Sequence, residues 1–353
     1  MSDRLGITPA IATEASRQHG DTTLERVGLA ITGSGSAVPR TALSNHDLAQ
    51  VVDTSDEWIT SRTGIRQRHL ADPEYSLVSL AAIACQQALE QAGLSAGDVD
   101  LIVLATSTPD DLFGSAAKLQ ASIGANRAVA FDLTAACSGF VFGLVTVAQF
   151  IRTGLYRNVL LVGADVLSRW VDWQDRRTCV LFGDGAGAIV IQANERDRLL
   201  GFELHSDGTQ NSCLNLAYQG NAQPLISEVE ITQGGFQPIT MNGQEVYKFA
   251  VRKVPEVIEK ALFHAGLHSS DVNWLILHQA NQRILDAVAD RLGLPAEKVV
   301  SNLAKYGNTS AASIPLALHE AIEDGRIQVG DTLALSGFGA GLTWGAAIVQ
   351  WGR

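Results

Sequence analysis

The chain has 353 residues, which is enough for two packed halves of ordinary domain size. Its composition, with 46% hydrophobic residues, 18% charged residues and 33 Gly against 9 Pro, excludes a collagen, a coiled coil or a largely disordered protein. The net charge of −11 argues against bulk binding to nucleic acid, which needs a basic surface. An acidic partner would have to bind at a local basic patch.

The four cysteines form no CxxC pair and are too few for a disulfide framework, which predicts a reducing, cytoplasmic location. The chain shows no basic region followed by an apolar stretch near its start, so no signal peptide is expected. Two uncharged stretches, residues 133–151 and 332–351, are long enough to span a membrane, but polar residues and glycines interrupt both. We expect buried core there and no membrane association.

The predicted elements begin after residues 1–25, which show no sustained hydrophobic periodicity and are expected to form a loose extension. An apolar strand that starts near Val27 runs into the Gly/Ser/Pro turn of VGLAITGSGSAVP. Further along, the strand AVAFDLT leads into the long apolar helix AACSGFVFGLVTVAQFI, and the strand NVLLVGADV follows.

An internal repeat is the most informative feature of the organisation. Residues 88–104 read ALEQAGLSAGDVDLIVL, and residues 261–277 read ALFHAGLHSSDVNWLIL. Each copy predicts a helix that ends at a glycine, a short loop and a buried apolar strand. The two copies lie about half a chain length apart, which indicates a duplicated fold.

The match continues beyond the repeat. The second half contains a helix in GNTSAASIPLALHEAI and a strand in DTLALSGF, and each half ends in a Gly-rich turn that enters an apolar strand. We therefore predict an α/β fold, internally duplicated, with sheets covered by helices on both faces. The predicted halves are residues 26–200 and 201–353. Sites in such folds favour the junction between the halves and the carboxyl ends of strands.

Cys137 is the first candidate for chemistry. It lies where the strand AVAFDLT gives way to a long helix. The dipole and the free N–H groups of a helix N-terminus favour a thiolate, so Cys137 is a candidate nucleophile. A small, buried core thiol is the alternative interpretation of the same position.

His278 and Asn308 are the second and third candidates. His278 ends the strand WLILH, where it could face a cleft or simply pack against a backbone carbonyl. Asn308 precedes the helix that mirrors the Cys137 helix, and taken alone it would be a helix N-cap. The duplication places all three residues at corresponding edges of the two halves. A Cys/His/Asn set can serve as the catalytic residues of an acyl-transfer reaction.

Six separated motifs carry a resemblance to a known family. They are FDLTAACSGF around Cys137, HQANQR at His278, YGNTSAAS at Asn308, FGDGAGA at 182–188, GFGAGLTWG at 337–345 and VDTSDEWITSRTGIRQRH at 52–69. From about residue 27 to its end, the chain resembles β-ketoacyl-acyl carrier protein synthase III, the condensing enzyme that initiates type II fatty acid synthesis. The resemblance implies the thiolase-like fold, in which helices and sheets are layered α-β-α-β-α.

The resemblance also implies a reaction. Cys137 would accept the acyl group of a short acyl-CoA, in the first place acetyl-CoA, with the backbone N–H groups of Cys137 and Ala340 as the oxyanion hole. Malonyl-acyl carrier protein would then lose CO2, and His278 and Asn308 would stabilise the resulting enolate. The product would be a 3-oxoacyl-acyl carrier protein. No metal and no other cofactor is expected, because the departing carboxylate supplies the carbanion.

Binding residues are implied by the same motifs. The expected CoA-binding residues are Trp58, Arg62, Arg176, Gly243 and Asn281. The expected docking residues for an acidic acyl carrier protein are Lys248, Arg252, Lys253, Gln279, Ala280, Asn281, Gln282 and Arg283. An ordinary charged helix surface is the alternative for the basic ones. The resemblance further implies a homodimer in which Phe113 closes the acyl pocket of the partner subunit. The alternative is that Phe113 packs in the dimer interface without a role in the pocket.

Other functions stay open at this stage. A related acyltransferase of a polyketide or secondary-metabolite pathway, or an enzyme similar to 3-hydroxy-3-methylglutaryl-CoA synthase, would use the same fold. A degradative thiolase would carry a second cysteine in the C-terminal Gly-rich loop, and GFGAG has none. An elongating synthase would have His in place of Asn308. A silent partner subunit would lack the nucleophile or break the triad, whereas Cys137, His278 and Asn308 are all present.

Overall fold

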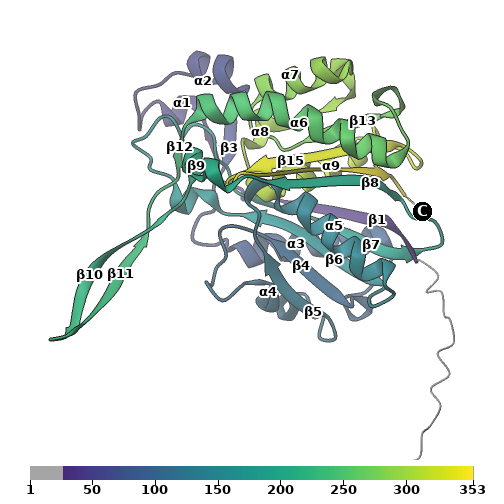
Figure 1. The fold of residues 1–353 in the computed structure, drawn as a ribbon, viewed down its shortest axis with the longest axis horizontal. Helices are drawn as coiled ribbons and strands as arrows, with labels where there is room; N and C mark the ends of the chain where they lie inside the picture. The colour runs from purple at the N-terminus through teal and green to yellow at the C-terminus, as the bar shows by residue number, and fades with distance from the viewer. Residues whose placement is uncertain (1–26, 353) are drawn as a thin grey trace, which may run out of the picture.

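The computed structural model describes residues 27–352, so the predicted extension over residues 1–25 lies outside the described residues. Two five-stranded sheets form the centre of the molecule (Figure 1). The strands of the first sheet are β1 (Gly28–Ala37), β4 (Leu101–Ala105), β5 (Val129–Leu133), β6 (Asn158–Asp165) and β7 (Gly185–Asn194). The strands of the second sheet are β8 (Leu199–Ser206), β13 (Trp274–Leu277), β14 (Val299–Val300), β15 (Thr332–Gly339) and β16 (Thr343–Gln350).

The two sheets have the same topology. Their strand orders are β5-β4-β6-β7-β1 and β14-β13-β15-β16-β8. In each sheet the first three strands are parallel and the last two are antiparallel to their neighbours. This correspondence confirms the predicted duplicated α/β fold. The exact division at residue 200 stays a prediction, and β8 already begins at Leu199.

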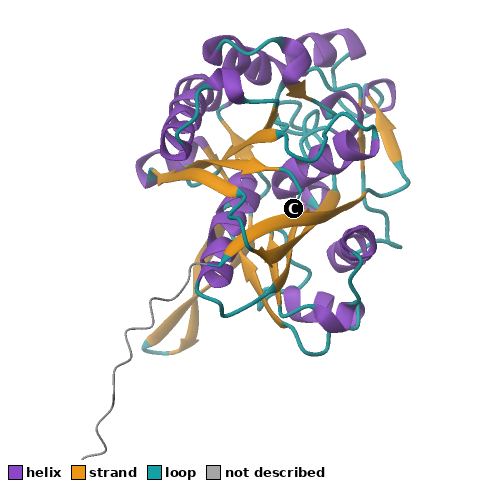
Figure 2. Cartoon of the chain, turned by 90° about the vertical axis from the view of Figure 1, so that its right-hand side faces the viewer, coloured by secondary structure: helices purple, strands orange, loops and turns teal. Residues whose placement is uncertain are grey.

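Helices cover both faces of each sheet (Figures 1 and 2). The central pair, α5 (Gly139–Arg152) and α9 (Ser313–Glu323), packs between the sheets and contacts strands of both. The outer pair, α3 (Leu77–Ala92) and α6 (Gly243–Ala265), covers the first and the second sheet respectively. The layering is therefore α-β-α-β-α, as predicted. Because sheets lie on both sides of α5, its residues are almost all apolar.

The repeated AGL segment ends the two outer helices. Gly93 after α3 and Gly266 after α6 both have a φ of 68°, in the left-handed region where glycine is favoured over residues with a side chain. The sequence repeat therefore reflects one C-cap used twice.

Smaller elements surround the sheets. The helices are α1 (Asn45–Leu48), α2 (Asp56–Thr63), α4 (Ala116–Ser122), α7 (Gln282–Leu292) and α8 (Leu303–Tyr306). The short strands are β2 (Ala42–Ser44), β3 (Gln67–His69), β9 (Leu214–Asn215) and β12 (Thr240–Met241). A long hairpin, β10 (Tyr218–Ile226) with β11 (Val229–Phe236), extends away from the body and was not predicted (Figure 1). Within residues 27–352, no helix is long and apolar enough to cross a membrane.

Candidate active site

Cys137 lies in a 3-10 turn, Ala136–Ser138, that joins β5 to α5. The sequence predicted the helix N-terminus correctly, but the helix proper begins two residues later, at Gly139. Cys137 is buried, and β15 packs directly against its backbone. A Cβ added to Gly339 would lie 2.7 Å from the Cys137 amide nitrogen, so only glycine lets this strand approach so closely.

Burial dominates the electrostatics of Cys137. It raises the pKa of the Cys137 thiol to about 12; a hydrogen bond from the Ser310 side chain acts in the opposite direction, and the charge of Asp165 adds to the rise. Cys137 is therefore a protonated thiol at neutral pH. Forming the thiolate then depends on groups that act once substrate is present.

His278 follows β13 directly and is 1% exposed. Its Nδ1 lies 2.7 Å from Ser313 Oγ, and its ring meets the edge of Phe338 at 5.4 Å between centroids. Burial lowers the pKa of His278 to about 3, although the backbone of Ser310 opposes this shift. The imidazole is therefore neutral near pH 7, and a neutral imidazole has one N–H to donate.

Asn308 is held by the segment FGDGAGA of the other half. Its backbone N–H donates to Leu181 O at 2.9 Å, and its carbonyl accepts from Gly183 N at 3.0 Å. This pairing forms an isolated parallel bridge between Phe182 and Asn308. The Asn308 Oδ1 accepts from Ser310 N at 2.9 Å, which directs the amide and leaves its NH2 group as the donor for a ligand.

One cavity brings the predicted catalytic and CoA-binding side chains together. It measures about 170 Å³ and is lined by Cys137, His278 and Asn308 together with Trp58, Arg62, Arg176, Gly243 and Asn281. These eight residues come from both halves of the chain. Trp58 and Asn308, for example, are far apart in the sequence and line the same cavity. The motifs therefore converge on a single site.

Trp58 is the aromatic centre of the outer part of this cavity. The guanidinium carbons of Arg62 and Arg176 lie 5.9 and 5.2 Å from its ring centroid. Asn281 Nδ2 donates to the carbonyl of Arg62 at 3.0 Å, and Arg176 donates to the carbonyl of Asp53 at 3.1 Å. A flat aromatic ring flanked by two planar cations suits a nucleotide base with nearby phosphates.

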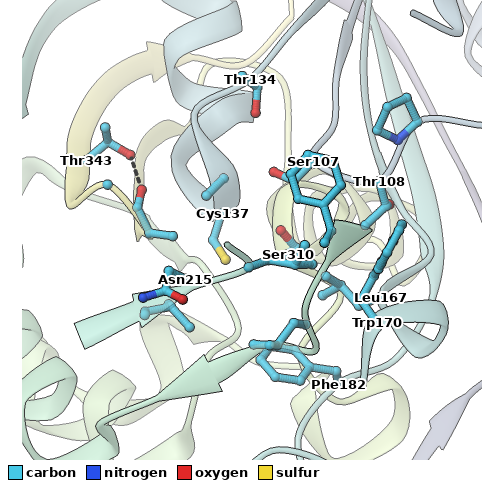
Figure 3. A pocket seen from close by; sticks show the side chains of 18 of the residues that line it. Ser107, Thr108, Thr134, Cys137, Leu167, Trp170, Phe182, Asn215, Ser310 and Thr343 are labelled. Atoms are coloured by element: carbon cyan, nitrogen blue, oxygen red, sulfur yellow. Dashed lines mark hydrogen bonds between the residues drawn. The ribbon is translucent and has the colours of Figure 1, made fainter. Parts of the chain in front are cut away.

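A second, larger cavity meets the first at Cys137. It measures about 650 Å³, and most of its lining is apolar, including Leu167, Trp170 and Phe182. Figure 3 shows the Cys137 Sγ at this cavity, beside Ser310. Ala340 also lines it. Cys137 thus stands between the smaller cavity, which contains Trp58 and two arginines, and a larger apolar one.

The predicted docking residues are only partly at the surface. Lys248 and Arg252 on α6 and Arg283 on α7 are exposed. Lys248 pairs with Glu245 at 2.9 Å, and Lys253 pairs with Glu256 at 3.0 Å. Among the residues that the structure describes, Arg252 and Arg283 form no ion pair.

Gln279 corrects one of these expectations. Its side chain is 0% exposed, and its amide bonds the carbonyls of Leu277 and Val300 and the N–H of Asn302. It holds the loop after β13 in place and cannot reach a docked protein. Gln282 is bonded to Asp286 and Ser301, and Ala280 lines the smaller cavity.

Three functional side chains were not singled out from the sequence. Ser310 and Ser313 stand two and five residues after Asn308 in GNTSAAS, and both contact the other site residues. Asp165, 0% exposed at the end of β6, is a second acceptor for the Ser310 hydroxyl, whose single proton goes either to Asp165 or to Cys137. Further donors to the Asp165 carboxylate are Thr106 Oγ1, Ser107 N, Thr108 Oγ1 and Ala311 N. The sequence signal that could have identified Asp165 was a single acidic residue at the end of an otherwise largely apolar strand.

No group of three His, Cys, Asp or Glu side chains among residues 27–352 has the arrangement of a metal site. All four cysteines are free thiols; Cys85, Cys137 and Cys179 are buried, and Cys213 is partly exposed.

The chain matches two models of one family. The model described as 3-oxoacyl-[acyl-carrier-protein] synthase III matches residues 131–208, and the model of its C-terminal part matches residues 262–351. A β-ketoacyl-[acyl-carrier-protein] synthase III of Nostoc sp. is 71% identical over 94% of this chain and 100% of its own length. The crystal structure of 3-oxoacyl-[acyl-carrier-protein] synthase III from Aquifex aeolicus is 44% identical, with a TM-score of 0.84 over 92% of this chain and 100% of that one.

A third relative comes from another pathway. The priming β-ketosynthase of the R1128 polyketide biosynthetic pathway is 34% identical, with a TM-score of 0.85 over 93% of this chain and 97% of that one. By its sequence identity over nearly the whole length, the chain belongs to the 3-oxoacyl-[acyl-carrier-protein] synthase III family of condensing enzymes.

Proposed function

We propose that the chain condenses a short acyl-CoA, in the first place acetyl-CoA, with malonyl-acyl carrier protein and so initiates fatty acid synthesis. One observation carries the proposal: Cys137 stands where the cavity with Trp58 and two arginines meets an apolar cavity. An acyl-CoA whose nucleotide lies at Trp58 would present its thioester to Cys137. The acyl chain would then enter the apolar cavity.

The first half-reaction transfers the acyl group to Cys137. The thiol loses its proton as sulfur attacks the thioester carbonyl, and the bond to the CoA sulfur breaks as CoA leaves with a proton. The backbone N–H groups of Cys137 and Ala340 are proposed to hold the oxyanion. Backbone donors in a buried site stabilise the charge that develops in the transition state, because they need no reorganisation.

The second half-reaction forms the carbon–carbon bond. Malonyl-acyl carrier protein would place its thioester oxygen at His278 and Asn308, whose neutral N–H groups donate to it. Loss of CO2 leaves an enolate, and the enolate carbon attacks the acyl-Cys137 carbonyl. The C–S bond breaks, and Cys137 leaves as a thiolate that takes up one proton from solvent to restore the thiol. The electron pair comes from the departing carboxylate, so we propose that no metal or redox cofactor takes part.

The carrier protein is proposed to dock over α6 and α7, near Arg252 and Arg283. Both side chains are exposed, and the Arg283 guanidinium lies 5.3 Å from the ring centroid of Tyr247, which lines the smaller cavity. An acidic carrier protein would place its negative surface on them, which fits a basic patch on an acidic enzyme. Lys248 and Lys253 would contribute less to the attraction of an acidic carrier protein, because each is paired with a glutamate.

We also propose a cytoplasmic homodimer. Among residues 27–352, no strand pairs with the outer side of the edge strand β5, and Val129 is 50% exposed there. Phe113 is fully exposed, and it lines a hollow with Leu112 and Phe131 beside β5. A two-fold partner that covers this face would bury Phe113 close to an acyl cavity. The free thiols support a reducing compartment.

A product assay tests the overall reaction. The protein is mixed with acetyl-CoA and malonyl-acyl carrier protein, and the carrier protein is analysed by mass spectrometry. The proposal expects acetoacetyl-carrier protein with the parent protein and none with His278→Ala or Asn308→Ala. Equal product from malonyl-CoA without the carrier protein would contradict the assignment of the carrier as partner.

A priming role in a polyketide pathway is the second candidate. The apolar cavity of about 650 Å³ favours it, because an acetyl group needs only a small part of that volume. A panel of acyl-CoA starters of increasing length decides between the two. A higher kcat/KM for acetyl than for longer chains supports the first candidate, and the reverse order supports the second.

A further inference from the structure

Arg68, on β3, is a fully buried arginine. It is 0% exposed, and it forms no ion pair with a carboxylate among residues 27–352. Burial lowers the pKa of Arg68 to about 10, so the guanidinium is still charged at neutral pH. A buried charge without a counter-ion is costly unless hydrogen bonds satisfy it. The stabilisation of Arg68 therefore comes from its hydrogen bonds to neutral groups.

The guanidinium of Arg68 joins segments that are distant in the sequence. Its Nη1 donates to the carbonyl of Leu43 at 3.0 Å, and its Nη2 donates to Asn45 Oδ1 at 2.9 Å and to the carbonyl of Val180 at 2.8 Å. A planar guanidinium carries five N–H donors in fixed directions, so it can hold three separate acceptors in one geometry. Arg68 therefore fixes Val180 relative to β2 and α1.

The segment that holds Asn308 begins directly after Val180, with the backbone bonds of the parallel bridge. Arg68 also lies against this bridge. A Cβ added to Gly183 would lie 3.2 Å from the Arg68 Cβ, and a Cβ added to Gly307 would lie 3.3 Å from it. Each glycine is next to one of the two bridged residues. Arg68 therefore supports both sides of the bridge as well as the residue that leads into it.

Arg68 is also connected to helix α2, which carries two of the expected nucleotide-binding residues. Asn45, which accepts from Arg68, donates through Nδ2 to Asp56 Oδ1 at 2.8 Å and to the carbonyl of Ile65 at 2.8 Å. Asp56 is the first residue of α2, and Ile65 follows the glycine that caps its last turn. Both ends of α2 are thus tied, through Asn45, to the same guanidinium.

We propose that Arg68 is a positioning residue for the decarboxylation of malonyl-acyl carrier protein: it sets the place of Asn308 by fixing the segment from Val180 to Gly183. The inference rests on the proposed function, in which Asn308 donates to the malonyl thioester oxygen, and goes beyond it. Asn308 has no part in the proposed transfer of the acyl group to Cys137. Arg68 therefore supports the second half-reaction and not the chemistry of the first.

Arg68→Met tests the proposal, because methionine is unbranched and cannot donate to any of the three acceptors. CO2 release from malonyl-acyl carrier protein measures the second half-reaction. The rate at which acetyl-pantetheine acetylates Cys137 measures the first, and this substrate lacks the nucleotide that α2 would bind. Since a misplacement of about 1 Å can cost about 10²-fold in rate, we expect CO2 release to fall about 10- to 100-fold, with acetylation changed less than about twofold.

Arg66→Met is the matched control, because Arg66 stands two residues before Arg68 and its side chain is exposed. It should change neither half-reaction. Arg68→Lys is the second variant, which keeps the charge and places a single nitrogen among the acceptors. We expect it to show the same selective loss of CO2 release at a smaller size. Thermal unfolding checks that each variant folds, and Arg68→Lys decides the question if Arg68→Met does not.

A double variant separates positioning from general damage. If Arg68 acts through Asn308, adding Arg68→Met to Asn308→Ala should cause little further loss of CO2 release, because the residue that Arg68 positions is already gone. Losses that multiply in the double variant would overturn the proposal. An equal fall of both half-reactions in the Arg68 variants would overturn it as well.

The bridge itself gives a readout that does not depend on catalysis. The amides of Gly183 and Asn308 form its hydrogen bonds, and their hydrogen exchange should be faster in Arg68→Met than in the parent protein. Unchanged exchange at both would refute the proposal. Loss of CO2 release in Asn308→Ala but not in the Arg68 variants would overturn the role of Arg68 and leave the proposed function standing. A parent protein that releases no CO2 would overturn the proposed function, and this inference with it.

Discussion

Asp165 and Gly339 occupy equivalent positions in the two halves of the chain. Each is the last residue of the third strand of its sheet, β6 or β15. Asp165 Oδ2 accepts from Ala311 N at 3.2 Å, and Gly339 packs on Cys137 N, which is the equivalent amide of the first half. A fixed carboxylate therefore fills one helix N-terminus. The absence of a side chain at Gly339 leaves the other N-terminus available for a substrate oxyanion.

Gly339→Ala tests this use of the duplicated N-terminus. The added Cβ would lie 2.7 Å from Cys137 N and 3.0 Å from Cys137 Cβ, so the turn that carries the nucleophile must shift. Loss of one oxyanion donor costs about 10²–10³-fold in kcat, and we expect a fall of that order. Steady-state kinetics with acetyl-CoA measure it. Ala340→Gly is the control, because it keeps the backbone donor, and wild-type kinetics in Gly339→Ala would contradict the account.

Asp165 and Ser310 are expected to shift the titration of Cys137 in opposite directions. The carboxylate of Asp165 raises the pKa of Cys137, and the Ser310 hydrogen bond lowers it. Asp165→Asn should therefore move alkylation of Cys137 to lower pH, and Ser310→Ala should move it to higher pH. Alkylation by iodoacetamide, followed by peptide mass spectrometry across a pH series, separates Cys137 from the other thiols. Shifts in the same direction for both variants would refute this assignment.

His278 is expected to make stability depend on pH. Its folded-state pKa of about 3 lies below the usual value of 6.5, so the unfolded chain binds a proton that the folded chain does not. Stability is therefore full above pH 6.5 and falls toward lower pH, by up to about 1.4 kcal/mol per pH unit. Urea unfolding at pH 7.5 and 5.0 measures the slope. His278→Gln should flatten it, while equal slopes in parent and variant would place this proton elsewhere.

Trp58 is expected to act on the nucleotide part of the substrate only. Trp58→Ala removes the ring between Arg62 and Arg176, and aromatic–cation contacts of this kind contribute about 0.5–2 kcal/mol. We expect the KM for acetyl-CoA to rise about tenfold with kcat nearly unchanged. Acetyl-pantetheine, which lacks the nucleotide, is the matched control substrate and should show no change. A similar loss with both substrates would mean that the variant disturbs the cavity as a whole.

Much of the fold could be predicted from the sequence because local signals agree with the architecture. The AGL repeat marks two left-handed caps, and uncharged segments such as residues 133–151 mark elements buried on all sides. The hairpin escaped prediction because its residues are polar or weakly apolar and lack a strong strand pattern. Which of its residues share a face becomes clear only from the pairing register.

Site residues that lie in a recognisable sequence motif could be predicted. Site residues whose role comes from contacts between distant segments could not. Cys137, His278 and Asn308 lie in separate motifs, and their convergence on one cavity follows from the duplication. The roles of Ser310 and Asp165 depend on side-chain contacts between distant segments, which no local pattern encodes. Gln279 was assigned to a docking surface because it neighbours His278 in sequence, yet the turn after β13 directs it inward.

The most direct test of the account is the mass of the intact protein after incubation with acetyl-CoA, followed by addition of malonyl-acyl carrier protein. The account predicts a gain of one acetyl group on the parent protein and none on Cys137→Ala. It also predicts that the carrier protein then removes this group as acetoacetyl-carrier protein. Acetylation of Cys137→Ala to the same extent as the parent would contradict the account, and so would an acetyl group that the carrier protein fails to discharge.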